Sequence, residues 1–206
     1  MRHSLKQSIR SMTGKEAIIC VGKIIEPDFS IDSEELENAY KAVYGAFVQG
    51  VYEGARSKGV MLIGAVGCGK TVCSKIMHRL FRDSNSRFLY KRGAEINDLI
   101  ETMPLAEIKQ IFGVGLKCDL YIDDFGVNDA DGKKYGNTIS VMGELIFDRY
   151  ELFVNEGYRT HISTNLLPES NNPEYRTIRK VFGDRVYDRI SQMTIPIVFT
   201  NKSLRK

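Results

Sequence analysis

The residues Gly64-Ala65-Val66-Gly67-Cys68-Gly69-Lys70-Thr71 form the most informative segment of this 206-residue chain. They have the spacing G-x-x-x-x-G-K-T, which is the Walker A pattern of phosphate-binding loops. An apolar run at residues 60–63 precedes them and predicts a buried strand, and residues 71–81 follow with helical periodicity. Between a strand and a helix, the glycines let the backbone wrap so that N–H groups point at phosphate oxygens. The segment therefore predicts a nucleotide-binding loop.

Each polar residue of this loop has an expected role. We expect all eight residues to hold ATP, with Lys70 reaching the β- and γ-phosphates and the Thr71 hydroxyl holding Mg²⁺. Cys68 occupies a variable position of the pattern, for which a redox role is the alternative. A chance glycine-rich turn is the alternative for the loop as a whole, and the flanking strand and helix argue against it.

A second acidic segment follows the predicted strand at residues 118–122. Leu120-Tyr121-Ile122-Asp123-Asp124 is an apolar run that ends in two carboxylates, a Walker B arrangement. We expect Asp123 to contact the Mg²⁺ shell and Asp124 to orient or activate the attacking water. Many related ATPases carry Glu at the second position, so the shorter Asp predicts slow hydrolysis and leaves a non-hydrolysing scaffold open. A surface acidic turn is the alternative. The D-F-G spelling at 124–126 does not indicate a protein kinase, because no H-R-D catalytic loop accompanies it.

Two further segments supply candidate catalytic groups. The predicted strand at 159–163 ends in Ser163-Thr164-Asn165, and we expect Asn165, with Thr164 as second choice, to sense the γ-phosphate or the water. The alternative for Asn165 is a helix cap. Arg185 and Arg189 are four residues apart and share a helical face. Arg189, with Arg185 as alternate, is the candidate arginine finger for a neighbouring subunit's ATP, and pairing with an adjacent aspartate is the alternative.

Apolar and helical patterns alternate along the rest of the chain. Strands at 87–91 and 195–199 and helices at 94–112 (broken near Pro104), 138–155 and 173–192 complete the α/β pattern of a parallel sheet with helices on both faces. Asp32 and Glu35 resemble a capping box that begins a helix at 33–55. We expect residues 1–31 to form an N-terminal extension, with a possible strand at 17–21, and residues 32–206 to form one domain.

The composition is typical of a globular chain and excludes several classes of protein. The formal charge is +3, the sequence pI is about 8.6 and 43% of the residues are hydrophobic. Four scattered cysteines without a C-x-x-C pair argue against a disulfide framework and a zinc site. No apolar stretch approaches about 18 residues and no signal peptide begins the chain, so we expect a cytoplasmic protein with no membrane contact.

The motifs together resemble a known family. The Walker A segment, Asp123-Asp124-Phe125-Gly126, Ser163-Thr164-Asn165-Leu166 and residues 183–190 (GDRVYDRI) resemble the DnaC-type AAA+ ATPases, a family that includes IstB-like proteins. The resemblance runs from about residue 35 to the C-terminus. It implies an AAA+ P-loop NTPase fold with strand order 5-1-4-3-2 and no C-terminal lid, and it favours Arg189 as the finger. Arg205, near the end, would then serve near the nucleotide.

The resemblance also implies a biological role. It implies an ATPase of DNA replication, with weak hydrolysis that a partner or DNA stimulates, that loads a replicative helicase of the DnaB type onto single-stranded DNA. Self-association would place ATP at subunit interfaces. The alternative is an IstB-like transposition helper that binds DNA and recruits a transposase, and the short N-terminal extension leaves that alternative open. A small P-loop kinase is a further alternative, against which the absence of an arginine-bearing lid argues.

Two basic clusters are candidate DNA contacts. The first comprises Arg79, Arg82, Arg87, Lys91 and Arg92, and the second comprises Lys133 and Lys134 beside Tyr135. Phosphate neutralisation beside an aromatic ring is how proteins hold single strands without sequence preference. A solvated surface is the alternative for each cluster.

Overall fold

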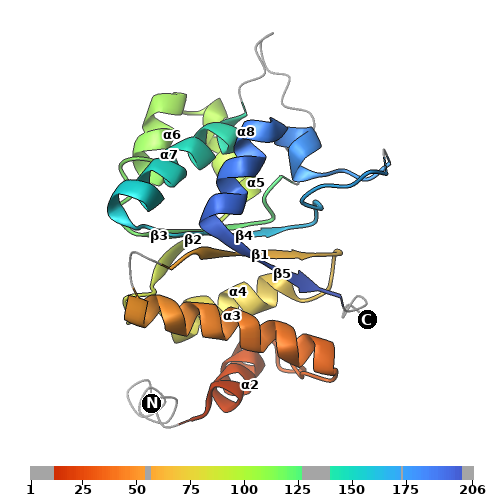
Figure 1. Cartoon of the computed structure of the whole chain (residues 1–206). Helices are drawn as coiled ribbons and strands as arrows, with labels where there is room; N and C mark the ends of the chain where they lie inside the picture. The colour runs from red at the N-terminus through yellow and green to blue at the C-terminus, as the bar shows by residue number, and fades with distance from the viewer. Residues whose placement is uncertain (1–11, 54–56, 127–139, 173, 201–206) are drawn as a thin grey trace.

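Five parallel strands form the centre of the molecule (Figure 1). The computed structural model describes residues 12–53, 57–126, 140–172 and 174–200. The strands are β1 (Gly59–Gly64), β2 (Phe88–Arg92), β3 (Asp119–Asp123), β4 (Thr160–Thr164) and β5 (Thr194–Phe199). Their order is β2-β3-β4-β1-β5, which confirms the predicted order 5-1-4-3-2. Because all five strands are parallel, their carboxyl ends, including those of β1, β3 and β4, meet at one edge.

Helices cover both faces of this sheet, as predicted. One face carries α2 (Gly14–Ile25), α3 (Glu34–Glu53) and α4 (Lys70–Leu80), and the other carries α5 (Gly93–Asp98), α6 (Leu105–Phe112), α7 (Val141–Glu156) and α8 (Ile178–Met193) (Figure 1). A short 3-10 turn, η2 (Leu99–Glu101), joins α5 to the segment before α6. Among the described residues, no helix is long and apolar enough to cross a membrane.

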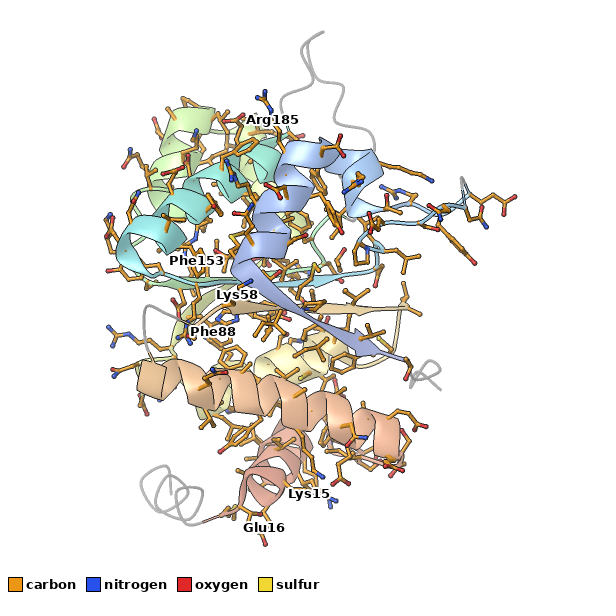
Figure 2. All side chains as sticks on the ribbon, viewed as in Figure 1. Lys15, Glu16, Lys58, Phe88, Phe153 and Arg185 are labelled. Atoms are coloured by element: carbon orange, nitrogen blue, oxygen red, sulfur yellow. The ribbon has the colours of Figure 1, made fainter. Side chains whose placement is uncertain are left out.

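The alternation of side chains along each strand divides the core into two layers. Tyr121 of β3 packs with the α2–α4 layer, whereas its neighbours Leu120 and Ile122 pack with the α5–α8 layer. Figure 2 shows the same division, with Phe88 on the α3 side of the sheet and Phe153 on the α7 side. Successive residues of a strand point to opposite faces, so β1 and β3 contribute to both cores.

Residues 17–21 form a helix rather than the possible strand. Thr13 caps α2: the Glu16 N–H donates to its Oγ1 at 3.4 Å, and the Thr13 N–H donates back to Glu16 Oε2 at 2.8 Å. This capping box holds the first turn, and the buried Ile18 and Val21 then pack against α3 and α4. The segment therefore belongs to the core of the α2–α4 layer.

Three other helix boundaries have clear local causes. Ser33, and not Asp32, caps the first turn of α3, because the Leu36 N–H donates to Ser33 Oγ at 3.1 Å. Asp32 instead accepts from Ser30. The predicted break at Pro104 is confirmed, since that residue is the N-cap of α6. Gly183, at φ 83° and ψ 169°, kinks α8 five residues after its start.

Candidate functional site: a P-loop with a shared carboxylate

The loop between β1 and α4 leaves the first N–H groups of the helix open to a ligand. Gly67 and Gly69 have φ values of 83° and 98°, a left-handed conformation that glycine adopts without steric cost. Gly69 is the N-cap of α4 and has no side chain with which to cap it. The N-terminus of the helix therefore presents free N–H donors and the positive end of its dipole, which together favour a phosphate.

Lys70 is folded back into the loop. Its side chain is almost fully buried, and its ammonium donates to the carbonyls of Gly64 and Ala65 at 2.8 and 2.9 Å. It also donates to Asn165 Oδ1 at 2.7 Å and lies 3.6 Å from Cys68 Sγ. A buried ammonium needs such partners. Phosphate oxygens can take the places of these neutral acceptors when nucleotide enters the loop.

The two candidates at the end of β4 differ in what they contact. Asn165 directly follows β4, and its Oδ1 accepts a hydrogen bond from the Lys70 ammonium at the start of α4, which places the amide beside the P-loop. Thr164 is buried, and its hydroxyl bonds only to backbone groups in the described residues: it donates to the Phe125 carbonyl at 2.8 Å and accepts from the Leu166 N–H at 3.0 Å. The geometry therefore favours Asn165 over Thr164, although its part in catalysis stays a prediction.

Asp123 is a buried carboxylate that three elements share. Thr71 Oγ1 donates to its Oδ2 at 3.0 Å, and the Tyr90 hydroxyl donates to the same oxygen at 2.6 Å. Ser163 Oγ on β4 donates to Oδ1. Burial and the contact with Asp123 raise the pKa of Tyr90 above its ordinary value, so the phenol keeps its proton and remains a donor.

The sequence patterns did not single out Tyr90 or Ser163 as site residues. Tyr90 lies on the edge strand β2, beside β3, and Ser163 lies on β4, on the other side of β3. Their contacts with Asp123 depend on the register of the sheet, in which Arg92 faces Asp123 and Ile122 faces Ile162. Neither residue belongs to a motif, and both strands carry other polar residues, so no local sequence signal marks them.

Asp124 begins a tight turn at the carboxyl edge. Its φ of 56° is the one positive value among the described non-glycine residues, and Gly126 follows at 80°. The Asp124 N–H donates to Ser163 Oγ at 3.0 Å, and the Phe125 N–H donates to the Ser163 carbonyl at 2.8 Å. A left-handed non-glycine residue is held in place only by its surroundings, and here β4 supplies the contacts. This turn sets where the second carboxylate of the Walker B pair lies.

The polar groups near α4 suit Mg²⁺. The Thr71 hydroxyl and the Asp123 carboxylate are hard oxygen ligands 3.0 Å apart, next to the open N-terminus of α4. No group of three or more His, Cys, Asp or Glu side chains gathers into a metal site in the described ranges. Mg²⁺ is commonly held by one or two carboxylates together with substrate phosphates and water, and this donor set fits that mode.

The two candidate arginine fingers lie on α8, away from this chain's own loop. The Arg189 guanidinium lies over the Tyr150 ring at 4.2 Å from its centre and 3.8 Å from Asp188. Arg185 is exposed on the outer side of the α5–α8 layer (Figure 2). No hydrogen bond or ion pair joins either arginine to the P-loop in the described part of the chain. Lys133, Lys134, Tyr135 and Arg205 lie outside the described residues.

Comparisons with known proteins find similarity of structure only. No protein-family model matches the sequence, and no curated protein does. A crystal structure of DnaI matches with a TM-score of 0.56 and 21% identity, over 87% of this chain and 89% of the other. A crystal structure of the DnaC helicase loader matches at 0.55 and 18%, over 83% and 93%.

A third solved structure is domain III of the replication initiation protein DnaA from Thermotoga maritima, with a TM-score of 0.55 and 20% identity. This match covers 83% of the present chain and 64% of the DnaA chain. All three similarities rest on the arrangement of the sheet and its helices. The resemblance inferred from the motifs is thus confirmed at the level of the fold: the chain has the AAA+ P-loop fold of the DnaC-type ATPases.

Proposed function

We propose that this chain is an AAA+ ATPase of DNA replication that loads a replicative helicase onto single-stranded DNA. The observation that carries the proposal is the convergence of Lys70, Thr71, Asp123 and Asn165 at the mouth of the P-loop. Two neighbours in fold, DnaI and the DnaC helicase loader, support the replication role and match over most of their own length.

Each residue of the proposed site has a distinct task. The P-loop N–H groups and Lys70 hold the phosphates of ATP, and Thr71 and Asp123 hold Mg²⁺, which neutralises charge on the β- and γ-oxygens when bound. Asp124 orients the attacking water. Because its side chain is one methylene shorter than Glu, hydrolysis is slow until a partner or DNA repositions the turn that carries it.

Asn165 links this site to the state of the nucleotide. In the structure its amide oxygen accepts from the Lys70 ammonium. When phosphate oxygens replace Asn165 as the acceptor of the Lys70 ammonium, the amide of Asn165 can contact the γ-phosphate or the attacking water. The arginine finger acts between subunits: Arg189, which is remote from its own loop, completes the ATP site of a neighbouring copy, so that assembly depends on ATP.

An ATP-dependent capture experiment tests the helicase-loading role. Tagged full-length protein and its Lys70→Ala variant are incubated in lysate of the source cell with Mg-ATP, and the bound proteins are identified by mass spectrometry. We expect a hexameric replicative helicase with the wild type and its loss with Lys70→Ala. Recovery of a transposase instead, with no helicase, would contradict the proposed role while leaving the fold and the site unaffected.

A further inference from the structure

The segment that runs from the P-loop through α4 to β2 carries an unusual share of the positive charge. Residues 70–92 contain seven Lys and Arg residues and one acidic residue, Asp83, a formal charge of +6. The whole chain carries +3, so the remaining residues together carry −3. Such a concentration on one helix and the strand that follows attracts a polyanion.

The cations on α4 form a stripe. Lys75 and Arg79 lie at positions i and i+4, which places them on one face of the helix, and Arg82 follows two residues after the helix ends. They line a hollow of about 290 Å³ together with His78 and, from the end of α2, Ile25. Lys75 and Arg79 are exposed and form no ion pair with any residue that the structure describes, whereas Arg82 lies 3.7 Å from Asp83.

His78 adds an aromatic surface to this hollow, and it is neutral near pH 7. Its ring lies 5.2 Å from that of Phe88 and 6.0 Å from that of Tyr90. Partial burial, with the charge of Arg82 beside it, lowers its pKa below the ordinary value. The positive charge of the hollow therefore comes from Lys75, Arg79 and Arg82.

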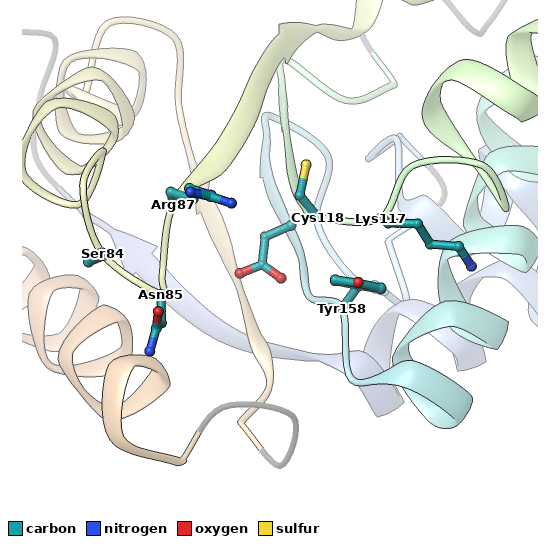
Figure 3. Close-up of a pocket in the computed structure, with 7 residues that line it drawn as sticks. Ser84, Asn85, Arg87, Lys117, Cys118 and Tyr158 are labelled. Atoms are coloured by element: carbon teal, nitrogen blue, oxygen red, sulfur yellow. The ribbon is translucent and has the colours of Figure 1, made fainter.

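A second hollow of about 290 Å³ is lined in part by residues that follow Arg82 in the chain. The chain from Arg82 to Arg87 leads into it, and its lining includes Ser84, Asn85, Arg87, Cys118 and Tyr158 (Figure 3). It lies at the amino ends of β2, β3 and β4, at the edge opposite the P-loop. Lys117 also lines the hollow but turns aside to pair with Glu156. Its one acidic lining residue, Asp119, is neutralised by an ion pair with Arg159.

The aromatic ring in the second hollow favours an unpaired base. The half-buried Tyr158 side chain stacks on no other aromatic ring among the described residues, and exposed Arg87 approaches the same space from the start of β2 (Figure 3). A tyrosine face next to an arginine is a stacking platform that every nucleobase fits. The bases of a duplex are already stacked, so this platform favours binding of single-stranded over double-stranded DNA.

We propose that single-stranded DNA binds along this track, with its phosphates on Lys75, Arg79 and Arg82 and a base against Tyr158 beside Arg87. This inference rests on the proposed function and deepens it, because it gives the bound DNA a location on the protein. It also places the bound DNA on α4, the helix whose first residues, Lys70 and Thr71, belong to the proposed ATP site.

The test is binding of a fluorescein-labelled oligo-dT, measured by fluorescence anisotropy on the full-length protein with and without Mg-ATP. Lys75→Ala/Arg79→Ala is compared with the control Lys41→Ala/Arg176→Ala, which changes the net charge equally on two exposed residues elsewhere. We expect the first pair to weaken binding at least tenfold. Its salt dependence, measured between about 50 and 200 mM, falls by about 1.4 in log–log slope, since each phosphate contact on a single strand contributes about 0.7. The control binds as the wild type does.

Substitutions of Tyr158 provide a second test, because they change the aromatic ring and leave the charge of the protein unchanged. We expect Tyr158→Ala to weaken oligo-dT binding about tenfold and Tyr158→Phe to leave it unchanged, because phenylalanine retains the stacking face. Equal loss in both double variants, unchanged affinity and slope in Lys75→Ala/Arg79→Ala, or equal binding of a duplex would each overturn the proposal.

Binding of a fluorescent ATP analogue to the same samples separates the two proposals. A wild type that binds the nucleotide but not oligo-dT overturns the DNA track alone, and an acidic protein partner would then fit the stripe. A wild type that binds no nucleotide contradicts the proposed function itself. A normal melting temperature and nucleotide affinity in each variant show that the loss of DNA binding does not come from misfolding.

Discussion

Asp123 is the side chain on which the geometry of the site depends most. It is fully buried, and its two oxygens accept hydrogen bonds from α4, β2 and β4. A buried carboxylate is costly unless such donors surround it. In the proposed function Thr71 and Asp123 would hold Mg²⁺, and Tyr90 and Ser163 are the neighbours that would keep the carboxylate oriented. Neighbours of this kind affect metal affinity without touching the metal.

Tyr90→Phe tests this positioning role. The variant removes one donor to Asp123 Oδ2 and leaves the ring stacked on Tyr121. We expect the Mg²⁺ concentration needed for half-maximal binding of a fluorescent ATP analogue to rise roughly tenfold. Tyr44→Phe is the matched control, because its hydroxyl has no hydrogen bond within the described ranges. An unchanged Mg²⁺ requirement in Tyr90→Phe would show that the phenol is not needed to orient Asp123.

At the scale of elements, α2 packs on α3 and α4, the helices that cover the same face of the sheet. Its buried residues pack in the same core as residues of α3, α4 and β1. Gly22 leaves room for the ring of Phe29 in the segment between α2 and α3, since a Cβ at this position would lie 2.1 Å from that ring. Because α4 begins with Lys70, packing of α2 supports the helix that carries the phosphate-binding groups.

Two isoleucines of α2 provide a matched test of this docking. Ile18 is 2% exposed and Ile24 is 45% exposed. We expect Ile18→Ala to lower the free energy of unfolding by about 2–4 kcal/mol through lost burial and a residual cavity. Ile24→Ala changes it by less than about 0.5 kcal/mol. Urea denaturation measures both free energies, provided that the variants unfold with the same m-value as the wild type. Equal destabilisation by the two substitutions would mean that α2 does not dock as described.

The elements differ in how well the sequence predicts them. The strands beside the P-loop and Asp123 are short apolar runs bounded by turn residues, and their helices have clear periodicity, so local patterns were sufficient. Residues 17–21 are an apolar run of five, which fits either a strand or one side of a helix. The decisive signal there is the capping pair Thr13 and Glu16, of which Thr13 lies four residues before the start of that run.

The site shows the same division between local and long-range information. Lys70 and Thr71 are adjacent in one motif, and the pairing of Thr71 with Asp123 joins two motifs at the carboxyl ends of β1 and β3, with β4 between them. The contacts of Tyr90 and Ser163 depend on which residues lie opposite Asp123 across two strand pairs. Register of this kind is set by packing of the whole sheet, which no local pattern specifies.

At the scale of the whole molecule, a buried histidine links the stability of the fold to pH. His161 of β4 accepts a hydrogen bond from the Val60 N–H at 3.2 Å and stacks on Phe47 at 4.5 Å. Burial, with Arg159 and Arg149 nearby, holds its pKa well below 6.5. The folded state therefore keeps His161 neutral at pH values where the unfolded chain already binds a proton.

This difference predicts loss of stability in mild acid. Below pH 6.5 the unfolded state binds the additional proton and the folded state does not, so stability falls as pH falls. We expect the His161 contribution to lower the free energy of unfolding by about 1.4 kcal/mol between pH 7.5 and 5.5. His161→Asn retains an acceptor for Val60 and removes the titration. Its unfolding free energy should fall less over this range, and an equal pH dependence would contradict the prediction.

The central claim is that this fold binds ATP through Lys70 at the N-terminus of α4. Titration of a fluorescent ATP analogue with Mg²⁺ into wild type, Lys70→Ala and the exposed-lysine control Lys41→Ala tests it most directly. We predict saturable binding to wild type and control, and roughly 10–100-fold weaker binding to Lys70→Ala, because a charged hydrogen-bond donor to phosphate contributes about 1.5–3 kcal/mol. Equal affinity in all three proteins, or no binding to the wild type, would contradict the claim.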